Sequence, residues 1–462
     1  MYALKYKEVL ILAFLVVFSS TSLSYWMLEY SWLEQQRIAQ LLLVFVASLV
    51  FILSCLCGSS PTVLPSGTLL LALFLGLVSA LLSQYPEWAL KEWAKYTSSV
   101  ALIVCLGHML RQPCAQQSVL FVLLVTSVVL VVQFYAFYLA SFFTGTRSVN
   151  PYLMYPGFDN PRFYGQFQVL LIPVLHGLLL QQGWGEKFFN KKVIFLTLLL
   201  QWSIVWALAG RGVLLGLGLA VLIMLLATGF RYKVLVSRIL GFAVTGAVLY
   251  VLLFFFIPEW VGLAKNLPSS IRFGLSRREI LWEGAWVMFQ ANPILGVGPL
   301  HYSAVWNHLG AHPHQAILQF LAEWGGVATG LLLFSILLGM WYGLNRVRTT
   351  SNYLDAALWV SLMASLVLAQ VDGVFVMPYS EGWLAIIAGL ATARWRGAVK
   401  VTAVAFFMRR TMFFILLLFA VVIVGRILIV DVPELHEASK GFYEKHNIGS
   451  PPRFWDQGWI PM

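Results

Sequence analysis

Charged side chains are scarce in this chain. Asp, Glu, Lys and Arg make up 11% of its 462 residues, against 60% hydrophobic residues and a mean hydropathy of +0.82. Ordinary soluble domains carry about 25% charged residues, so the composition excludes a soluble globular protein. The net charge of +11 does not indicate a nucleic-acid partner, because the basic residues are spread over short segments and form no dense stripe.

Cysteine is also rare. Cys55, Cys57, Cys105 and Cys114 fall within apolar runs or near the face that we assign to the inside, so no external disulfide is expected. Cys55 and Cys57 lie one residue apart, but no second pair or neighbouring histidine accompanies them. A buried apolar role is therefore favoured over a metal site.

Two features of many transporters are missing. The sequence shows no internal repeat and no pair of broken helices in corresponding halves. Ionisable residues gather at the ends of the apolar runs rather than inside them. These absences favour a protein that carries out chemistry at one face of a membrane over a transporter.

Apolar runs of membrane-spanning length, by contrast, recur along the chain, and each can satisfy its backbone hydrogen bonds as a helix. We predict an all-α integral membrane protein with twelve to thirteen transmembrane helices in a single polytopic domain, residues 1–462. The expected spans are 9–28, 38–57, 66–83, 97–110, 118–143, 166–182, 193–209, 212–229, 239–257, 314–343, 355–376, 382–393 and 411–430.

The distribution of Lys and Arg predicts the orientation, because short cytoplasmic loops are enriched in both. If Lys5 and Lys7 face the cytoplasm, so do the basic clusters at 187–192, 231–238, 346–348 and 394–410. The long loop 258–313, expected to carry short helices, and the tail 431–462 then lie outside. The first segment ends in Tyr-Trp-Met and not in small residues, so it is interpreted as a helix and not as a cleaved signal peptide.

Histidines are concentrated at the end of the long loop. Four of the eight, His301, His308, His312 and His314, lie within fourteen residues. Such a cluster indicates acid–base chemistry or metal ligation. Metal ligation is the weaker alternative, because few carboxylates lie nearby and no His-Glu-x-x-His spacing occurs. His301 and His308 are equally interpretable as solvated loop residues.

His314 stands out by its position. Pro313 suits the first turn of a helix, which predicts that His314 lies at the N-terminal end of span 314–343. Helix N-termini attract anions, and an uncharged imidazole there can accept a proton. Gln315, Gln319 and Glu323 follow at helical spacing as one polar stripe, which is interpreted either as part of a site or as hydrogen bonding between helices.

Several arginines belong to the same outer face. Arg211 stands in an Ala-Gly-Arg-Gly link between two spans, where a charge is costly unless it faces a cavity. Arg277 and Arg278 open an amphipathic segment that we expect on the membrane surface, and Arg272 precedes them. Guanidinium groups suit phosphate oxygens. No Asp-x-Asp occurs in an external loop, so a metal-bridged diphosphate is not expected.

These residues resemble a known family. His314-Gln315, nine further residues and Gly325 are similar to the His-[Asn/Ser/Gln]-x9-Gly signature of the O-antigen ligase and polymerase superfamily. Further similar blocks are Gly-Val-Gly-Pro-Leu-His-Tyr at 296–302, Pro-Gly-Phe-Asp-Asn-Pro-Arg-Phe at 156–163 and Asp-Gly-Val-Phe-Val-Met-Pro-Tyr-Ser at 372–380. The blocks cover roughly residues 150–385, and their order adds to their specificity.

Within the superfamily, the stretch from His312 to Gly325 most resembles the pilin-type protein O-oligosaccharyltransferases. The chain departs from the usual pattern at Ala328, where Gly, Thr or Tyr is common, and at Gln315, where Asn is common. About thirty residues follow Asp431 instead of a large external domain, which resembles the subgroup that moves a single O-antigen unit.

The resemblance implies a GT-C-like fold in the bacterial inner membrane and a metal-independent, inverting transfer without a cofactor. The donor would be a glycan on a polyprenyl diphosphate, and the acceptor a hydroxyl of a pilin-like protein in the periplasm. By this resemblance His314 would be the catalytic base, and Arg211, Arg278 and Arg277 would hold the diphosphate. Supporting roles would fall to Arg162, His312, Gln315, Gln319, Glu323, Asp372 and Tyr379.

Other functions stay open. An O-antigen ligase that uses lipid A–core as its acceptor comes close behind, and a polymerase that extends a lipid-linked glycan is third. A flippase for lipid-linked glycans is the alternative from a different class. A flippase should retain part of its activity after His314→Ala, whereas a transferase should lose nearly all of it.

Overall fold

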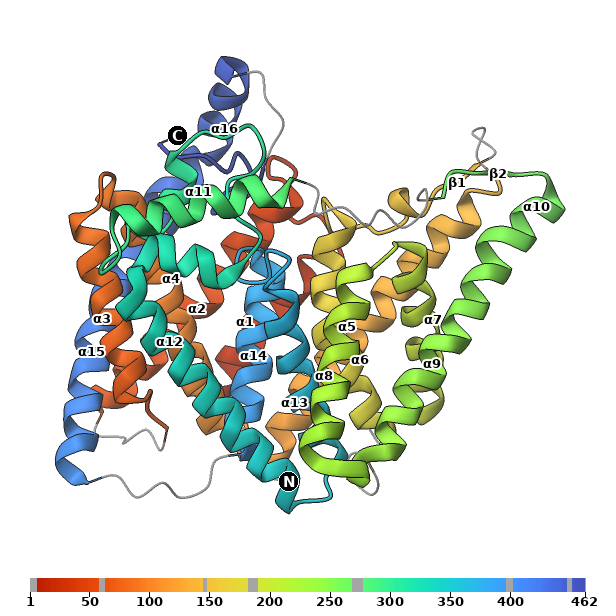
Figure 1. Ribbon diagram of the computed structural model, residues 1–462, viewed down its shortest axis with the longest axis horizontal. Coiled ribbons are helices and arrows are strands. Elements are labelled where there is room, and N and C mark those ends of the chain that lie inside the picture. Colours follow the sequence, from red (N-terminus) through yellow and green to blue (C-terminus); the bar gives the residue numbers. More distant parts are fainter. Residues whose placement is uncertain are drawn as a thin grey trace.

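The computed structural model describes residues 6–57, 63–143, 148–181, 190–267, 277–395, 402–446 and 451–461. Within them the chain is a bundle of helices, and the sheet is one parallel pair of two-residue strands, β1 (Ser148–Val149) and β2 (Ala264–Lys265). The expected all-α membrane fold is confirmed (Figure 1). Arg272 and part of the predicted basic clusters, Lys5, Lys187, Arg396 and Lys400, lie outside the described residues.

Each of the thirteen expected spans overlaps a long helix in the described part of the chain. These helices are α1 (Tyr6–Ser20), α2 (Trp32–Leu56), α3 (Gly67–Leu82), α4 (Pro86–Met109), α5 (Pro113–Ala140), α6 (Pro161–Leu180), α7 (Lys191–Ala207), α8 (Arg211–Thr228), α9 (Lys233–Val251), α12 (Ala316–Thr349), α13 (Tyr353–Leu368), α14 (Pro378–Trp395) and α15 (Ala403–Arg426). The spans expected at 97–110 and 382–393 are longer than predicted, because the polar first turns of α4 and α14 also belong to the helices.

Six helical runs among the described residues are long and apolar enough to cross a membrane. They are α2, α5, α6, the run Arg211–Val261, α12 and the run Ala403–Glu444, and the shorter α3 and α13 are apolar as well. The number of twelve to thirteen crossings remains a prediction.

Short helices decorate one end of the bundle. α9 continues through a π-helical turn (Leu252–Phe256) into α10 (Ile257–Val261), so the long loop begins after residue 261 and not at 258. Its helix α11 (Arg278–Ala291) lies across the end of the bundle, and α16 (Val432–His446) rises above it (Figure 1). α16 follows α15 through another π-helical turn (Ile427–Asp431), and 3-10 turns occupy Pro151–Leu153, Gly229–Tyr232 and His301–Ala304.

The two ends of the bundle separate the predicted faces. The described N-terminus and the junction of α8 with α9 lie at one end, and α11, α16 and the C-terminus lie at the other (Figure 1). Arg231 and Arg348 of the predicted inner clusters are neighbours there, since Arg231 donates a hydrogen bond to the carbonyl of Arg348. The long loop and the tail therefore share one end, and Arg231 and Arg348 of the predicted inner clusters lie at the opposite end.

Packing centres on two helices. α6 contacts α7, α8 and α13, and α4 contacts α2, α14 and α15, while α12 packs against α3 and α11. The four cysteines are free. This arrangement brings the first turns of α6 and α8 and the start of α11 to the same end of the molecule (Figure 1).

Candidate active site

A pocket of about 250 Å³ opens at the end that carries α11. Its lining comes from the start of α6, the turn between α7 and α8, the first residue of α11, and the end of α13 with the segment after it. The charged side chains in this lining are Arg162, Arg211, Arg278 and Asp372. Four residues that the sequence singled out, from four distant segments, therefore meet in one cavity.

Each of the three arginines stands in the first turn of a helix. Pro161 opens α6, and the Asn160 side chain accepts a hydrogen bond from the backbone N–H of Arg162 at 3.0 Å. Arg211 is the first residue of α8, behind a tight turn in which Ala209 has φ +51°. Three helix N-termini, each with a partial positive charge, thus adjoin the same pocket.

Arg278 occupies the corresponding place in α11, after Arg277 with φ +64°. Partial burial lowers its pKa, as do the charges of Arg162 and Arg211, whereas Asp372 opposes this decrease. Three guanidinium groups and one carboxylate leave the lining with two net positive charges. Such a pocket suits an anion that carries charge on neighbouring phosphate groups.

His314 does not line the pocket but lies next to Asp372, which does. Its Nδ1 lies 3.8 Å from Oδ1 of Asp372, which is too long for a hydrogen bond. The two side chains are 22% and 11% exposed, so a substrate can reach both. Trp282 Nε1 donates to the carbonyl of Pro313 at 3.1 Å, which ties α11 to the residue before His314.

The predicted start of the helix at His314 is wrong. α12 begins at Ala316, Gln315 is its N-cap, and His314 has φ +54° in the left-handed region. The N–H of Ala316 donates to the carbonyl of Ala369 at 2.9 Å, which draws the start of the helix toward α13. A left-handed conformation at a non-glycine residue costs about 1–3 kcal/mol and persists only where the surroundings enforce it.

His312 is part of those surroundings. Its ring centroid lies 3.9 Å from that of His314, and its Nδ1 accepts a hydrogen bond from the backbone N–H of His314 at 3.3 Å. Gly373 packs against the ring so closely that a β-carbon there would lie 2.6 Å from Cε1 of His312. Burial lowers the pKa of His312 well below its ordinary value, and the charges of His314, Arg453 and Arg278 lower it further. A neutral ring keeps Nδ1 free to accept that bond.

Comparison with protein families finds one match. Residues 196–335 match the family described as O-antigen ligase. The match supports the resemblance to the O-antigen ligase and polymerase superfamily. It runs from α7 into α12 and contains Arg211, Arg278, His312 and His314, whereas Arg162 and Asp372 lie outside it. A search of curated proteins returns no match. The match supports O-antigen ligase-like glycan transfer in general.

The glycine of the ligase signature has a clear structural role. At Gly325, φ is +76° and ψ is 171°, and α12 breaks there. The segment 293–298 fills the break: Gly298 N–H donates to the carbonyl of Glu323 at 3.0 Å, and Gly326 N–H donates to that of Pro293 at 2.8 Å. A β-carbon at Gly325 would lie 2.2 Å from the carbonyl oxygen of Ile294. The spacing between His314 and Gly325 therefore fixes the length of α12 between its start and the break that the segment 293–298 fills.

The side chains of the predicted polar stripe, Gln315, Gln319 and Glu323, contact other parts of the protein or are buried. Gln315 caps α12 and donates through Nε2 to Oε1 of Gln370 at 3.0 Å, and Gln319 is buried. Glu323 pairs with Arg453, 2.8 Å away, and its Oε1 accepts from the N–H of Tyr302 at 3.1 Å. The hydrogen-bonding interpretation of the stripe thus describes Gln315 and Glu323, although Glu323 pairs with the tail and not with a second helix.

Two other predicted residues lie apart from the pocket. Tyr379 is buried, and its hydroxyl donates to the carbonyl of Ser19 at 3.0 Å. Arg277 is exposed at the N-cap of α11 and does not line the pocket. These positions give Tyr379 a packing role and leave Arg277 beside the site.

The two remaining loop histidines, His301 and His308, differ in burial. His301 is buried, and its Nε2 accepts from the N–H of Tyr85 at 2.9 Å, so the interpretation as a solvated residue is wrong for it. His308 is exposed beside Trp306. Among the described residues, no three His, Cys, Asp or Glu side chains come together as a metal-binding group.

Sequence reasoning missed a buried ionic network beneath the histidines. It joins three cations and three anions: Arg37, Lys95 and Arg453 with Glu92, Glu323 and Glu381. Lys95 lies 2.9 Å from Glu92 and 2.7 Å from Glu381, and all six residues are at most 8% exposed. Glu381 stands in the first turn of α14, at a helix end as expected, whereas Glu92, Lys95 and Glu323 lie further inside α4 and α12. The signals in the sequence were Glu323 in the polar stripe and the i, i+3 spacing of Glu92 and Lys95.

Proposed function

We propose that this protein transfers a glycan from a polyprenyl diphosphate to a hydroxyl group of a pilin-like protein on the periplasmic side of the inner membrane. The observation that carries this proposal is the pocket in which Arg162, Arg211 and Arg278 surround one carboxylate, with His314 behind that carboxylate. This combination supplies anion binding and a proton acceptor side by side.

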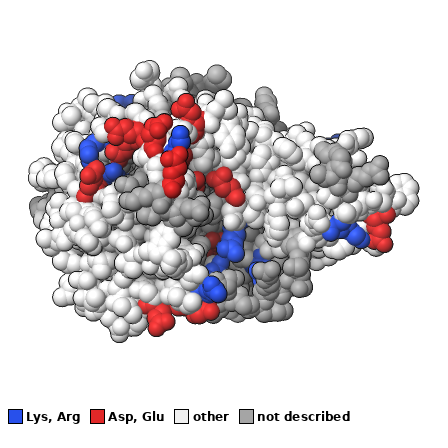
Figure 2. Space-filling model, turned by 90° about the horizontal axis from the view of Figure 1, so that it is seen from above, with Lys and Arg blue, Asp and Glu red and all other residues white. Residues whose placement is uncertain are grey.

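The donor diphosphate fits the three helix N-termini and their arginines. Each phosphate of a diphosphate diester carries negative charge, and the two net positive charges of the pocket lining complement it. Leu215, Leu368 and Val371 form an apolar part of the same lining, which suits the beginning of a polyprenyl chain. Seen from above, one group of Lys and Arg lies near the middle of the face, while others lie among the Asp and Glu, most of which are toward one side (Figure 2).

The transfer step follows from this placement. The acceptor oxygen attacks the anomeric carbon of the donor sugar and loses its proton to His314, while the bond from that carbon to the diphosphate oxygen breaks. The diphosphate leaves with the electron pair of that bond, and the arginines offset its growing charge. Attack opposite the leaving group inverts the anomeric configuration. Since guanidinium groups provide the positive charge, the step needs no metal ion.

Asp372 adds an orienting group. Its carboxylate faces Nδ1 of His314 at 3.8 Å, and such contacts in unliganded sites often tighten when substrate binds. A hydrogen bond from Nδ1–H to Asp372 would leave Nε2 of His314 as the proton acceptor. The carboxylate would also stabilise the imidazolium that forms.

Two acceptors are compatible with this chemistry. The pilin-like acceptor is supported by the resemblance of the stretch from His312 to Gly325 to the pilin-type transferases. The second candidate, transfer to lipid A–core, is supported by the description of the matching family as O-antigen ligase.

The test is glycan mass on both acceptors in a deletion strain. The strain is complemented with wild type, His314→Ala, Arg211→Gln, Arg278→Gln or the control Arg426→Gln, whose side chain is 53% exposed and pairs with Glu87 away from the pocket. We expect wild type and Arg426→Gln to add glycan to the pilin, and each of the other variants to lose on the order of 100-fold or more in rate.

The outcomes separate the alternatives. A glycan ladder on lipid A–core with an unchanged pilin mass would replace the acceptor that we favour. Extension of the lipid-linked glycan alone would indicate a polymerase. Substantial activity of His314→Ala at normal protein levels would contradict a transferase and favour a flippase.

A further inference from the structure

The C-terminal segment, residues 451–461, packs against the loop that carries the histidines. Trp459 is 4% exposed, and its ring lies 4.7 Å from that of Trp306 in the loop. Trp459 also forms a small apolar cluster with Ala311 and Phe442. The segment is therefore part of the folded structure around the loop.

Ser303 joins this segment to the residue before His312. The N–H of Ile460 donates to the carbonyl of Ser303 at 3.1 Å. The hydroxyl of Ser303 donates to the carbonyl of Ala311 at 2.9 Å. Ser303 is 1% exposed and Ala311 is 0% exposed, so a carbonyl that lost its donor here would stay buried and unsatisfied, which is costly.

The bond to Ala311 fixes the backbone from which the histidine turn begins. The Ala311 carbonyl belongs to the planar peptide group that includes the nitrogen of His312. Nδ1 of His312 in turn accepts a hydrogen bond from the N–H of His314 at 3.3 Å. A continuous series of contacts thus runs from Ile460 to the backbone of His314.

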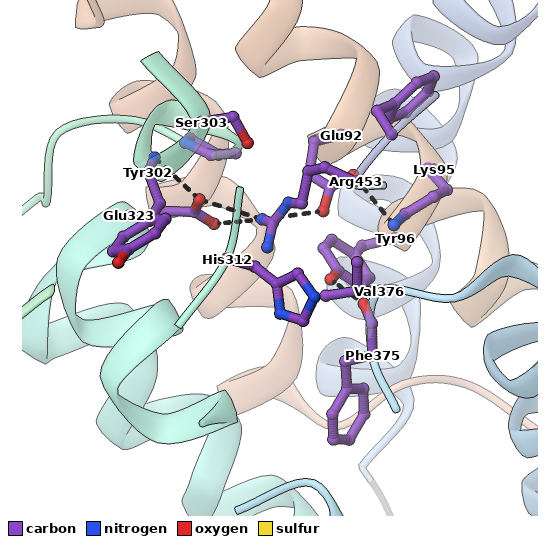
Figure 3. Close-up of polar contacts among 12 residues, drawn as sticks. Glu92, Lys95, Tyr96, Tyr302, Ser303, His312, Glu323, Phe375, Val376 and Arg453 are labelled. Carbon is purple, nitrogen blue, oxygen red and sulfur yellow. Dashed lines mark hydrogen bonds and ion pairs between the residues drawn. The ribbon is translucent and has the colours of Figure 1, made fainter. Parts of the chain in front are cut away.

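A second attachment holds the residue next to Ser303. Nη2 of Arg453 lies 2.8 Å from Glu323, and Oε1 of the same carboxylate accepts from the N–H of Tyr302 at 3.1 Å. Figure 3 shows Tyr302 and Ser303 beside the Glu323 carboxylate, with the Arg453 guanidinium on the other side of that carboxylate. The C-terminal segment thus holds two successive residues of the loop, one directly and one through Glu323.

The turn between Ser303 and Ala311 has its own hydrogen bonds. Oδ1 of Asn307 accepts from the N–H groups of Leu309 and Gly310, both at 3.0 Å, and Nδ2 of Asn307 donates to the carbonyl of Gly310 at 3.0 Å. The contacts with the C-terminal segment therefore determine where this turn lies, and not its internal shape.

We propose that the C-terminal segment is a positioning element for glycan transfer and that it acts through Ser303, whose hydroxyl holds the backbone that leads to His312 and His314. This proposal rests on the proposed function, because it concerns the step that His314 performs. Neither Ser303 nor the C-terminal segment touches the reacting atoms.

The test uses full-length variants that remove one buried contact each. Ser303→Ala removes the bond to Ala311, and Trp459→Ala weakens the attachment of the C-terminal segment. The matched control is Ser361→Ala, which removes an equally buried bond, from Ser361 to the carbonyl of Leu170 at 2.8 Å, between α13 and α6. Transfer rates are measured in membranes with polyprenyl-diphosphate-linked glycan and the acceptor that the deletion strain identifies, and the unfolding temperature of each purified variant is measured in detergent.

We expect Ser303→Ala to lower kcat about tenfold or more, because the histidine turn loses its fixed position. The donor KM should change less than about twofold, since the arginines of the pocket are untouched. Ser361→Ala should lower the unfolding temperature by a similar amount and keep kcat within about twofold of wild type. A wild-type kcat for Ser303→Ala, or an equal loss of kcat in Ser361→Ala, would reduce Ser303 to a structural role and overturn the proposal.

The double variant Ser303→Ala/Trp459→Ala tests whether the C-terminal segment acts through Ser303. Since residues that act through one another are not additive, the double variant should be at most about threefold slower than the slower single variant. Losses that multiply would show independent effects and overturn the proposed connection.

Two further variants keep the result decisive. If Ser303→Ala does not accumulate, Ser303→Cys carries a weaker donor of similar size and should lower kcat about threefold or more; a wild-type kcat would overturn the proposal. The proposed function fails separately, if His314→Ala equals wild type in the same assay.

Discussion

Replacing Gly373 with alanine should disable the site without touching a charged residue. The new β-carbon would lie 2.6 Å from Cε1 and 3.2 Å from Nε2 of His312, where ordinary contacts are 3.4–4 Å. The ring must therefore retreat by about 1 Å, a displacement at which the bond from the His314 N–H is lost. A misplacement of this size costs on the order of 100-fold in rate, and the overpacking destabilises the fold by about 1–3 kcal/mol.

The assay for Gly373→Ala is the rate of glycan transfer in membranes, normalised to the amount of folded protein. The matched control is Gly218→Ala in α8, where a β-carbon meets nothing within 4 Å and helix propensity improves by up to about 1 kcal/mol. The control should keep the wild-type rate. A Gly373→Ala protein that folds and transfers glycan at more than half the wild-type rate would refute the positioning role of His312.

Three other measurements address the fold and its response to pH. Gly325→Ala should lower the unfolding temperature in detergent, because it forces a β-carbon to 2.2 Å from the Ile294 carbonyl oxygen at a residue with φ +76°; an unchanged temperature would contradict the clasp between the loop and α12. The free energy of unfolding should decrease from pH 7 to pH 5 by up to about 1.4 kcal/mol per pH unit. The reason is that the pKa of His312 is low in the folded state and ordinary in the unfolded state, so that only the unfolded state binds the proton. The decrease should be smaller in His312→Asn, and an identical decrease would point to other groups. Exposed Cys57 should react with a membrane-impermeant maleimide only in inside-out vesicles, whereas a Glu437→Cys variant on α16 should react in intact spheroplasts; the reverse pattern would invert the predicted orientation.

The helices could be predicted because membrane-spanning runs are specified locally. Each apolar run satisfies its own backbone, so its existence does not depend on distant residues. The ends of the helices depend more on tertiary contacts. Pro313 suits a first turn, yet the bonds from Trp282 to Pro313 and from Ala316 to Ala369 hold residues 313–315 outside α12.

Part of the site could be predicted for the same reason. Arg211 and Arg278 were recognisable because a charge beside an apolar run is costly, and Asp372 was found through a block similar to a known family. The partner of Glu323 was not predictable, since Arg453 lies 130 residues further along the chain. No periodicity relates two residues at that separation, and only the folded bundle brings them together.

The ionic network has a consequence for how this protein is made. Five of its six members belong to helices, while Arg453 follows the last of them. Until that arginine has emerged from the ribosome and packed against the bundle, Glu92, Glu323 and Glu381 have only Arg37 and Lys95 to balance them. A nascent chain that stalls before residue 453 would carry one unmatched negative charge between its helices, at a cost of several kcal/mol.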